Sequence, residues 1–249
     1  FSYDANVLAW SPDGTRIVSA SQQFATVWNA TTGKMSSRCA GSAGYTTINS
    51  VAWSPDSKRI VLGDSQFKVI VCDAATGKTL LTYTPSDTGS NSGGYLSVAW
   101  SPNGKYIACG DVNSNVLILD ATTGKLLNNY VGPVTVNAVA WSPDSTYLAI
   151  GGFETAVTVV RNGDSGSNSI SFNGETDATV NALAWSPDSK RVASATESGL
   201  VQIGDIASQS ATFMYTRHFT DVYTVAWSPN GKYIASTDHD GNVEVWQAE

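Results

Sequence analysis

The chain has 249 residues, of which 42% are apolar and only 14% are charged, and its formal net charge is −7. This length can bury a large core. The acidic balance and the lack of a Lys/Arg cluster argue against nucleic acid or an anionic membrane surface as partners. No apolar run approaches the roughly 20 residues of a transmembrane helix.

Three cysteines, Cys39, Cys72 and Cys109, are spread widely along the chain. Their odd number and their spacing do not suggest a disulfide framework or a zinc site, so we expect free thiols that pack as small apolar side chains. The chain begins at Phe1 without an initiating Met or a signal peptide, and we expect it to be part of a longer protein. Unpaired cysteines and the missing signal peptide favour a cytoplasmic location.

The tetrapeptide Ala-Trp-Ser-Pro recurs through the whole chain, 1–249, and divides it into units of about 42 residues. The repeated Trp is found at Trp10, Trp53, Trp100, Trp141, Trp185 and Trp227. No change in composition marks a second domain. We therefore expect a single domain built from six similar units.

Each unit contains the same elements in the same order, as the third unit illustrates. An apolar run ends in Trp100, and Ser-Pro-Asn-Gly at 101–104 predicts a tight turn, because Pro restricts φ and Asn bonds its own backbone. Strand-like runs follow at 105–110 and 115–120, a Thr-Gly turn lies within 121–125, and a weaker run at 126–131 closes the unit. Since no helical period occurs, the unit is expected to be a four-stranded antiparallel meander.

One four-stranded sheet cannot bury both of its faces, whereas six such sheets can by packing face to face around an axis. The period of about 42 residues is typical of this arrangement, so we expect an all-β, six-bladed propeller. Glu249 follows directly after the third strand of the last unit, and too few residues precede Trp10 to supply another strand. We expect the last blade to lack its outer strand, leaving an edge that invites pairing with an upstream segment or a neighbouring chain.

The phrase Ser-Val-Ala-Trp-Ser-Pro-Asn-Gly-Lys-Tyr-Ile-Ala-Cys at 97–109 has a close copy at 224–236, which is followed by Asp-Gly-Asn-Val-Glu-Val-Trp at 240–246. With the Thr-Gly-Lys turns, these stretches resemble WD40 repeats, especially the bacterial kind. The resemblance covers the whole chain and implies a WD40-like propeller, although the family's commonest ring has seven blades.

The last unit is the one most similar to the family pattern. WD40 repeats often carry a hydrogen-bonded network of His, Ser or Thr, Asp and Trp, and the resemblance implies that His218, Ser236, Asp240 and Trp246 form it here. In the other units the position of this Trp is occupied by Trp28, Cys72, Leu119, Val160 and Gly204. In units two to five the Asp is replaced by Gln66, Asn113, Glu154 and Ser198. We expect those blades to be held by apolar packing and backbone pairing.

The sequence carries no catalytic motif that we can identify: no G-x-S-x-G, phosphate-binding loop, H-E-x-x-H or C-x-x-C is present. Asp238, His239 and Asp240 could suggest metal ligands, but alternate side chains in a tight turn point apart. Glu154, Glu197 and Asp238 are the only acids expected at the channel mouth. We expect no enzyme activity, no cofactor and no metal.

Function is expected in the loops that differ between units, at one face of the propeller. The candidate binding rim consists of the aromatic residues Tyr45, Phe67, Phe153 and Tyr223 and the amide residues Asn49, Asn137 and Asn181. Exposed aromatic side chains favour a protein interface, but these rings could equally cover the grooves between blades. The Asn residues lie four positions before a repeat Trp, and we favour a structural role in which they satisfy backbone groups.

The leading functional hypothesis is a scaffold that binds a protein or peptide on its loop face, as a sensor or regulatory module of a larger bacterial protein. This rests on the resemblance and on the lack of a catalytic motif. The alternative is a propeller that binds a small ligand or a glycan, and a propeller enzyme is the third possibility.

Overall fold

The computed structural model describes residues 7–44, 46–84, 94–132, 134–153, 156–163, 166, 169–172 and 178–248. Within these ranges the chain forms 23 strands and no helix. The strands make six antiparallel sheets, five with four strands and the last with three. The expected fold class, an all-β chain of six propeller blades, is confirmed, and the last blade has three strands in the described residues.

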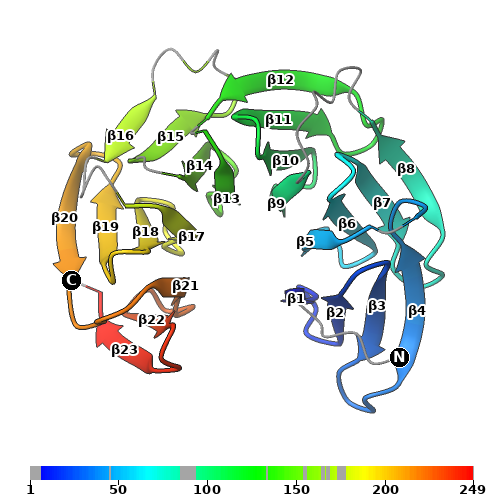
Figure 1. The fold of residues 1–249 in the computed structure, drawn as a ribbon, viewed down its shortest axis with the longest axis horizontal. Coiled ribbons are helices and arrows are strands. Elements are labelled where there is room, and N and C mark those ends of the chain that lie inside the picture. Colours follow the sequence, from blue (N-terminus) through cyan, green and yellow to red (C-terminus); the bar gives the residue numbers. More distant parts are fainter. Residues whose placement is uncertain are drawn as a thin grey trace. The chain divides into compact units, whose positions relative to one another are not determined.

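The chain divides into two compact units, Phe1–Asn129 and Tyr130–Glu249. The single domain expected over 1–249 stays a prediction. The first unit contains three sheets (Figure 1). The first sheet consists of β1 (Val7–Trp10), β2 (Arg16–Ala20), β3 (Phe24–Asn29) and β4 (Met35–Ala40). The second consists of β5 (Ile48–Trp53), β6 (Arg59–Asp64), β7 (Val69–Asp73) and β8 (Thr79–Tyr83). The third consists of β9 (Tyr95–Trp100), β10 (Tyr106–Asp111), β11 (Asn115–Asp120) and β12 (Leu126–Val131), which continues into the second unit.

The second unit contains the other three sheets. The fourth sheet consists of β13 (Val136–Trp141), β14 (Tyr147–Gly152), β15 (Val157–Arg161) and β16 (Ile170–Phe172). The fifth consists of β17 (Val180–Trp185), β18 (Arg191–Thr196), β19 (Val201–Asp205) and β20 (Ser210–Tyr215). The sixth consists of β21 (Val222–Trp227), β22 (Tyr233–Asp238) and β23 (Val243–Gln247). In every sheet the strands pair in chain order, as a meander requires.

Apolar layers lie between consecutive sheets of each unit. Alternate residues of a strand point to opposite faces, and β6 and β18 are buried along almost their whole length, so the second and fifth sheets are covered on both sides. Val18 and Val27 of the first sheet pack with Ile60 and Leu62 of the second, and Ile203 of the fifth packs in one cluster with residues of the sixth. Burying one such side chain contributes about 1.5–3 kcal/mol.

Three of the repeat Trp residues bond to the sheet before their own. Its indole N–H donates to the backbone oxygen next to the previous repeat Trp in the pairs Trp53–Ala9, Trp185–Ala140 and Trp227–Ala184, at 3.0, 2.8 and 3.1 Å. An Arg side chain of the preceding sheet lies over two of these rings, in the pairs Arg16–Trp53 and Arg191–Trp227, at 5.1 and 4.8 Å from the centroid. The recurring Trp therefore contributes to the contacts between neighbouring sheets within each unit.

The Ser-Pro turns form as their residues predict. The Ser11 hydroxyl donates to Asp13 Oδ1 at 2.6 Å, and the Thr15 backbone N–H donates to the same oxygen at 2.9 Å. These hydrogen bonds, the one from Ser11 first, hold the pKa of Asp13 well below its usual value. The repeated Ser, Asp and Asn of this phrase thus stabilise a turn.

One sequence prediction about cysteine is wrong. Cys39 of β4 and Cys72 of β7 form a disulfide that joins the first sheet to the second, while Cys109 is a buried free thiol. The two bonded residues are 33 positions apart in the chain and come together because the first two sheets pack face to face. The argument for a cytoplasmic location from unpaired cysteines therefore does not hold.

Candidate functional site

A buried polar network links the loop before the sixth sheet to that sheet. His218 lies in this loop, with Nδ1 at 2.9 Å from Asp238 Oδ2 and Nε2 at 2.6 Å from Ser236 Oγ. The indole N–H of Trp246 donates to Ser236 Oγ at 3.4 Å. His218, Ser236 and Trp246 thus meet as the family resemblance implies.

The acid of this network is Asp238, so the assignment of Asp240 is wrong. Asp240 lies in the turn after β22, where its carboxylate is exposed and 3.7 Å from His239. Side chains in a turn of this kind diverge, so a carboxylate two positions later cannot reach the ring of His218. The side chain of Asn242 and then His218 lower the pKa of Asp238 to about 2.

His218 contacts Asp238 on one side and Ser236 on the other, as the histidine of a hydrolase triad contacts its acid and its serine. The environment of Ser236, however, does not suit a nucleophile. Ser236 is fully buried, and its oxygen already contacts both the His218 ring and the Trp246 indole. A nucleophile must be exposed to its substrate. We therefore assign this network to the packing of the sixth sheet.

The position of Asp238 has a sequence signal that our assignment missed. An acid stands eleven residues after the repeat Trp in three units, as Asp64, Asp111 and Asp238. In each case the carboxylate accepts backbone N–H groups of the following turn; for example, Asp111 accepts from Asn113 and Asn115 at 2.8 and 2.9 Å. Counting from the Trp would have identified the acid, because capping a turn requires a fixed position.

The amides of the candidate rim are bound to backbone. Nδ2 of Asn49, Asn137 and Asn181 donates to the oxygens of Tyr95, Val180 and Val222, at 3.0, 3.4 and 3.0 Å. Each acceptor is the first residue of the next sheet's first strand, and each Asn is the extra residue of a β-bulge in its own strand. A bulge redirects a side chain, and here it points the amide at the neighbouring sheet. This geometry agrees with the structural role that the sequence favoured.

The aromatic candidates of the rim have different surroundings. Phe67 is buried and packs edge-on against Tyr95 with 6.0 Å between ring centroids, so the structure removes it from the accessible rim. Tyr45 lies outside the described residues. Phe153 and Tyr223 are exposed at 44% and 51% of their surface.

The sequence analysis overlooked a neighbour of Tyr223. Phe219 lies in the loop before β21 and is 93% exposed, although its neighbour His218 is buried. Tyr223 and His239 lie with ring centroids 5.9 Å apart. We call Phe219, Tyr223 and His239 the aromatic rim. The sequence did contain a signal that Phe219 is exposed. His218 was expected to face inward, and adjacent side chains in an extended loop point to opposite sides.

Backbone contacts hold the segments that carry the aromatic rim. The His239 backbone N–H donates to the Asp221 oxygen at 2.9 Å, which joins the turn after β22 to the loop before β21. Gly199 in the turn after β18 lies so near that a Cβ there would be 2.8 Å from the His218 oxygen. With the His218 ring held by Asp238 and Ser236, this loop is anchored from three sides. A fixed loop loses little entropy when a partner binds.

Metal and membrane sites find no support in the described part of the chain. No group of three or more His, Cys, Asp and Glu side chains there is arranged to hold a metal ion. Among the same residues there is no helix long and apolar enough to cross a membrane. Of the acids considered for an enzyme, Glu154 lies outside the described residues, and Asp238 belongs to the buried network.

Comparison with protein families gives two matches. The profile of the family described as WD domain, G-beta repeat matches residues 3–29 and 209–247. The profile described as Eukaryotic translation initiation factor eIF2A matches residues 90–204. No match was found among curated proteins.

Proposed function

Because this chain belongs to the WD40-repeat family, whose propellers generally bind proteins, we propose that it holds a protein or peptide segment on the aromatic rim. We also propose that the chain has a sensory or regulatory role within a larger bacterial protein, as the family resemblance implies. The observation that carries it is the 93% exposure of Phe219 on an anchored loop. A phenyl ring that the fold holds in water contributes nothing to the core. Covering this ring with a partner removes apolar surface from water, which favours binding.

The chemistry of the aromatic rim suits a polypeptide partner. Phe219 offers an apolar face, whereas Tyr223 and His239 each combine a ring with a polar atom that can hydrogen-bond to a peptide group. Tyr223 belongs to β21 and His239 to the turn after β22. The loop that carries Phe219 joins β20 to β21, as the chain trace shows (Figure 1). Rigid aromatic anchors with adjacent polar groups are the usual centre of a protein interface.

The test uses peptides selected from a random phage-displayed library against the full chain. We expect Phe219→Ala and Tyr223→Ala each to weaken binding of the selected peptides by about tenfold or more, because buried aromatic anchors dominate interface energies. Tyr233→Ala is the matched control, since Tyr233 is an exposed aromatic residue at the other end of the same sheet. Undiminished affinity in the Phe219/Tyr223 double variant, with unchanged thermal unfolding, would rule out the aromatic rim.

A further inference from the structure

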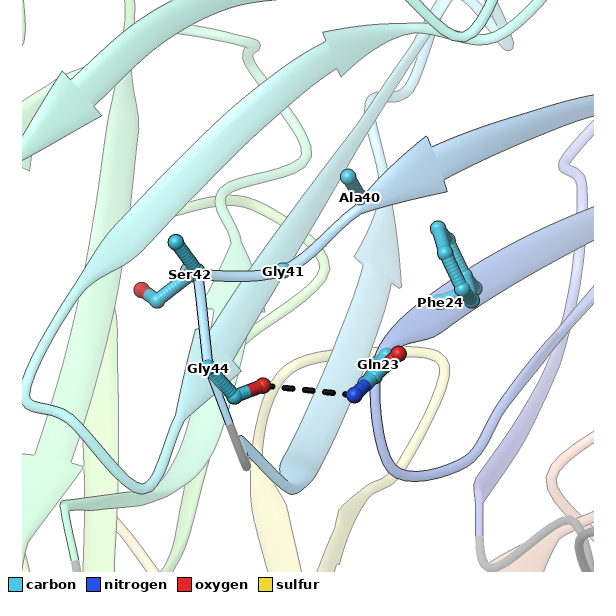
Figure 2. Close-up of a pocket in the computed structure, with 7 residues that line it drawn as sticks. Gln23, Phe24, Ala40, Gly41, Ser42 and Gly44 are labelled. Carbon is cyan, nitrogen blue, oxygen red and sulfur yellow. Dashed lines mark hydrogen bonds between the residues drawn. The ribbon is translucent and has the colours of Figure 1, made fainter.

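A second candidate site lies in the first unit, at the end of the first sheet where β3 begins and β4 ends. A pocket of about 420 Å³ is lined by Gln23, Phe24, Ala40, Gly41, Ser42, Ala43 and Gly44. Figure 2 shows the Phe24 ring and the Gln23 side chain on one side and the chain from Ala40 to Gly44 on the other. This volume falls within the range of ligand pockets, roughly 300–1,000 Å³.

The walls of this pocket are held by hydrogen bonds within the protein. The Gly41 backbone N–H donates to the Gln23 oxygen at 2.8 Å, and Gln23 Nε2 donates to the Gly44 oxygen at 3.3 Å. Ser42 donates both its backbone N–H and its hydroxyl to the buried carboxylate of Asp64 in the second sheet. The loop therefore has its shape before any ligand arrives.

A cation stands beside the aromatic wall. The Arg38 guanidinium lies over the Phe24 ring, 5.0 Å from its centroid. Arg38 is two residues before Ala40, the cross-strand partner of Phe24, so all three side chains project from one face of the sheet. Its neighbours Ser37 and Cys39 point the other way, into the contact with the second sheet, so Arg38 is free of that packing.

Arg38 makes no ion pair within the described part of the chain. A guanidinium stacked on a ring keeps its N–H edge available, and this edge matches the two oxygens of a carboxylate. The net charge of −7 does not oppose this, because at physiological salt the field of distant charges is screened beyond about 8 Å.

The geometry points to a binding site for an extended peptide that carries an Asp or Glu side chain, with a small apolar side chain two positions away. Side chains two positions apart in an extended peptide lie on the same side, about 7 Å from each other. The carboxylate pairs with Arg38, and the apolar side chain enters the pocket against Phe24, Ala40 and Ala43. Apart from Gln23 and Phe24 the lining side chains are small, so the apolar contacts to the guest come from Phe24 and the two alanines.

A carboxylate fits this site better than a phosphate. A phosphate dianion needs several donors. None of the residues that line the pocket is charged, and the N–H groups of Gly41 and Ser42 are already bound to Gln23 and Asp64. The buried carboxylate of Asp64 behind the loop also disfavours a doubly charged ligand.

The test is an array of capped peptides with Glu between Val or Ala residues two positions away, each matched by the same peptide with Gln. We expect wild type to bind the Glu member at least about tenfold more tightly in fluorescence anisotropy, and added salt to weaken this binding. Arg38→Gln should remove the preference for Glu, and Phe24→Ala should weaken both members of a pair.

Lys34→Gln is the matched control, because Lys34 is an exposed cation in the turn at the opposite end of β3 and β4. It should bind the peptides as wild type does. The proposal is overturned if Glu and Gln peptides bind equally, if no peptide is retained, or if Lys34→Gln loses as much binding as Arg38→Gln. Phe219→Ala should leave this binding unchanged, which separates the pocket from the aromatic rim.

Discussion

The contact between the first and second sheets and the contact between the fifth and sixth sheets use equivalent positions in different ways. Cys72 and Trp246 each pair with an Ile of the preceding strand, Ile60 or Ile234. Cys72 is bonded to Cys39 of β4, while Trp246 stacks on Tyr215 of β20 with 4.6 Å between ring centroids. One repeat thus joins an outer strand to the next sheet by a covalent bond, and the other by two aromatic faces.

The fourth and fifth sheets show a third solution at the same place. Gly204 occupies the position of Trp246, and Phe172 of β16 fills the space, so that a Cβ at Gly204 would be only 2.5 Å from the Phe172 ring. The comparison teaches that this position is defined by volume shared across two sheets. The space is filled by two stacked rings, by one ring against a glycine, or by a bond between two small residues.

The largest effect is expected from Trp246→Ala. The substitution removes the stacking on Tyr215 and leaves a cavity next to the His218 network, which should cost about 3–5 kcal/mol of unfolding free energy. Urea denaturation followed by Trp fluorescence measures this. Trp28→Ala is the comparison, because Trp28 is equivalent and donates to Ser19 Oγ at 2.8 Å. A loss at Trp246 below that at Trp28 would contradict the role of the aromatic stack.

The second largest loss of stability is expected when the disulfide between Cys39 and Cys72 is removed. Reduction, or the double substitution Cys39→Ala and Cys72→Ala, is expected to cost about 2–4 kcal/mol, because the bond restricts the unfolded chain between the two cysteines. The readout is the denaturation midpoint with and without reductant. Cys109→Ala is the control, since this thiol is buried but unbonded. If reductant shifts the wild-type midpoint no further than that of the double variant, the disulfide does not join the sheets.

Gly204→Ala tests the volume argument with a smaller effect. Its Cβ would overlap the Phe172 ring, and relief by shifting that ring should cost about 1–3 kcal/mol. Adding Phe172→Leu is expected to recover part of the loss, which a double-mutant cycle in urea would detect. If the effects of the two substitutions on the unfolding free energy simply add, Gly204 and Phe172 do not share one space.

The smallest change in stability is expected from lowering the pH. Because the pKa of Asp238 is lowered to about 2 in the folded chain, its stabilising contribution is complete above about pH 4 and is lost as the pH falls towards 2. The measurement is the denaturation midpoint at several pH values for wild type and Asp238→Asn. Wild type should lose more stability over this interval. If the denaturation midpoints of the two proteins fall in parallel as the pH is lowered, an ionised Asp238 does not stabilise the fold.

The candidate site was predictable in part. His218, Ser236 and Trp246 were placed by family resemblance, whereas the acid was assigned two residues too late because its position was not counted from the repeat Trp. Phe67 and Phe219 show what the sequence could not predict. Both are aromatic residues in variable loops, yet Phe67 has a φ of 54° and is buried against Tyr95, while Phe219 faces solvent. Exposure depends on neighbours from another sheet.

The sequence by itself determined the strands, their order and the number of sheets, because these depend on local patterns: alternating apolar residues, Ser-Pro and Thr-Gly turns, and a repeated Trp. Tertiary structure alone decided which residues of different sheets meet. The bond between Cys39 and Cys72, the packing of Phe67 against Tyr95 and the stacking of Trp246 on Tyr215 join residues whose separation in the chain carries no mark of their contact. Their proximity follows from the packing of whole sheets, which no short stretch of sequence encodes.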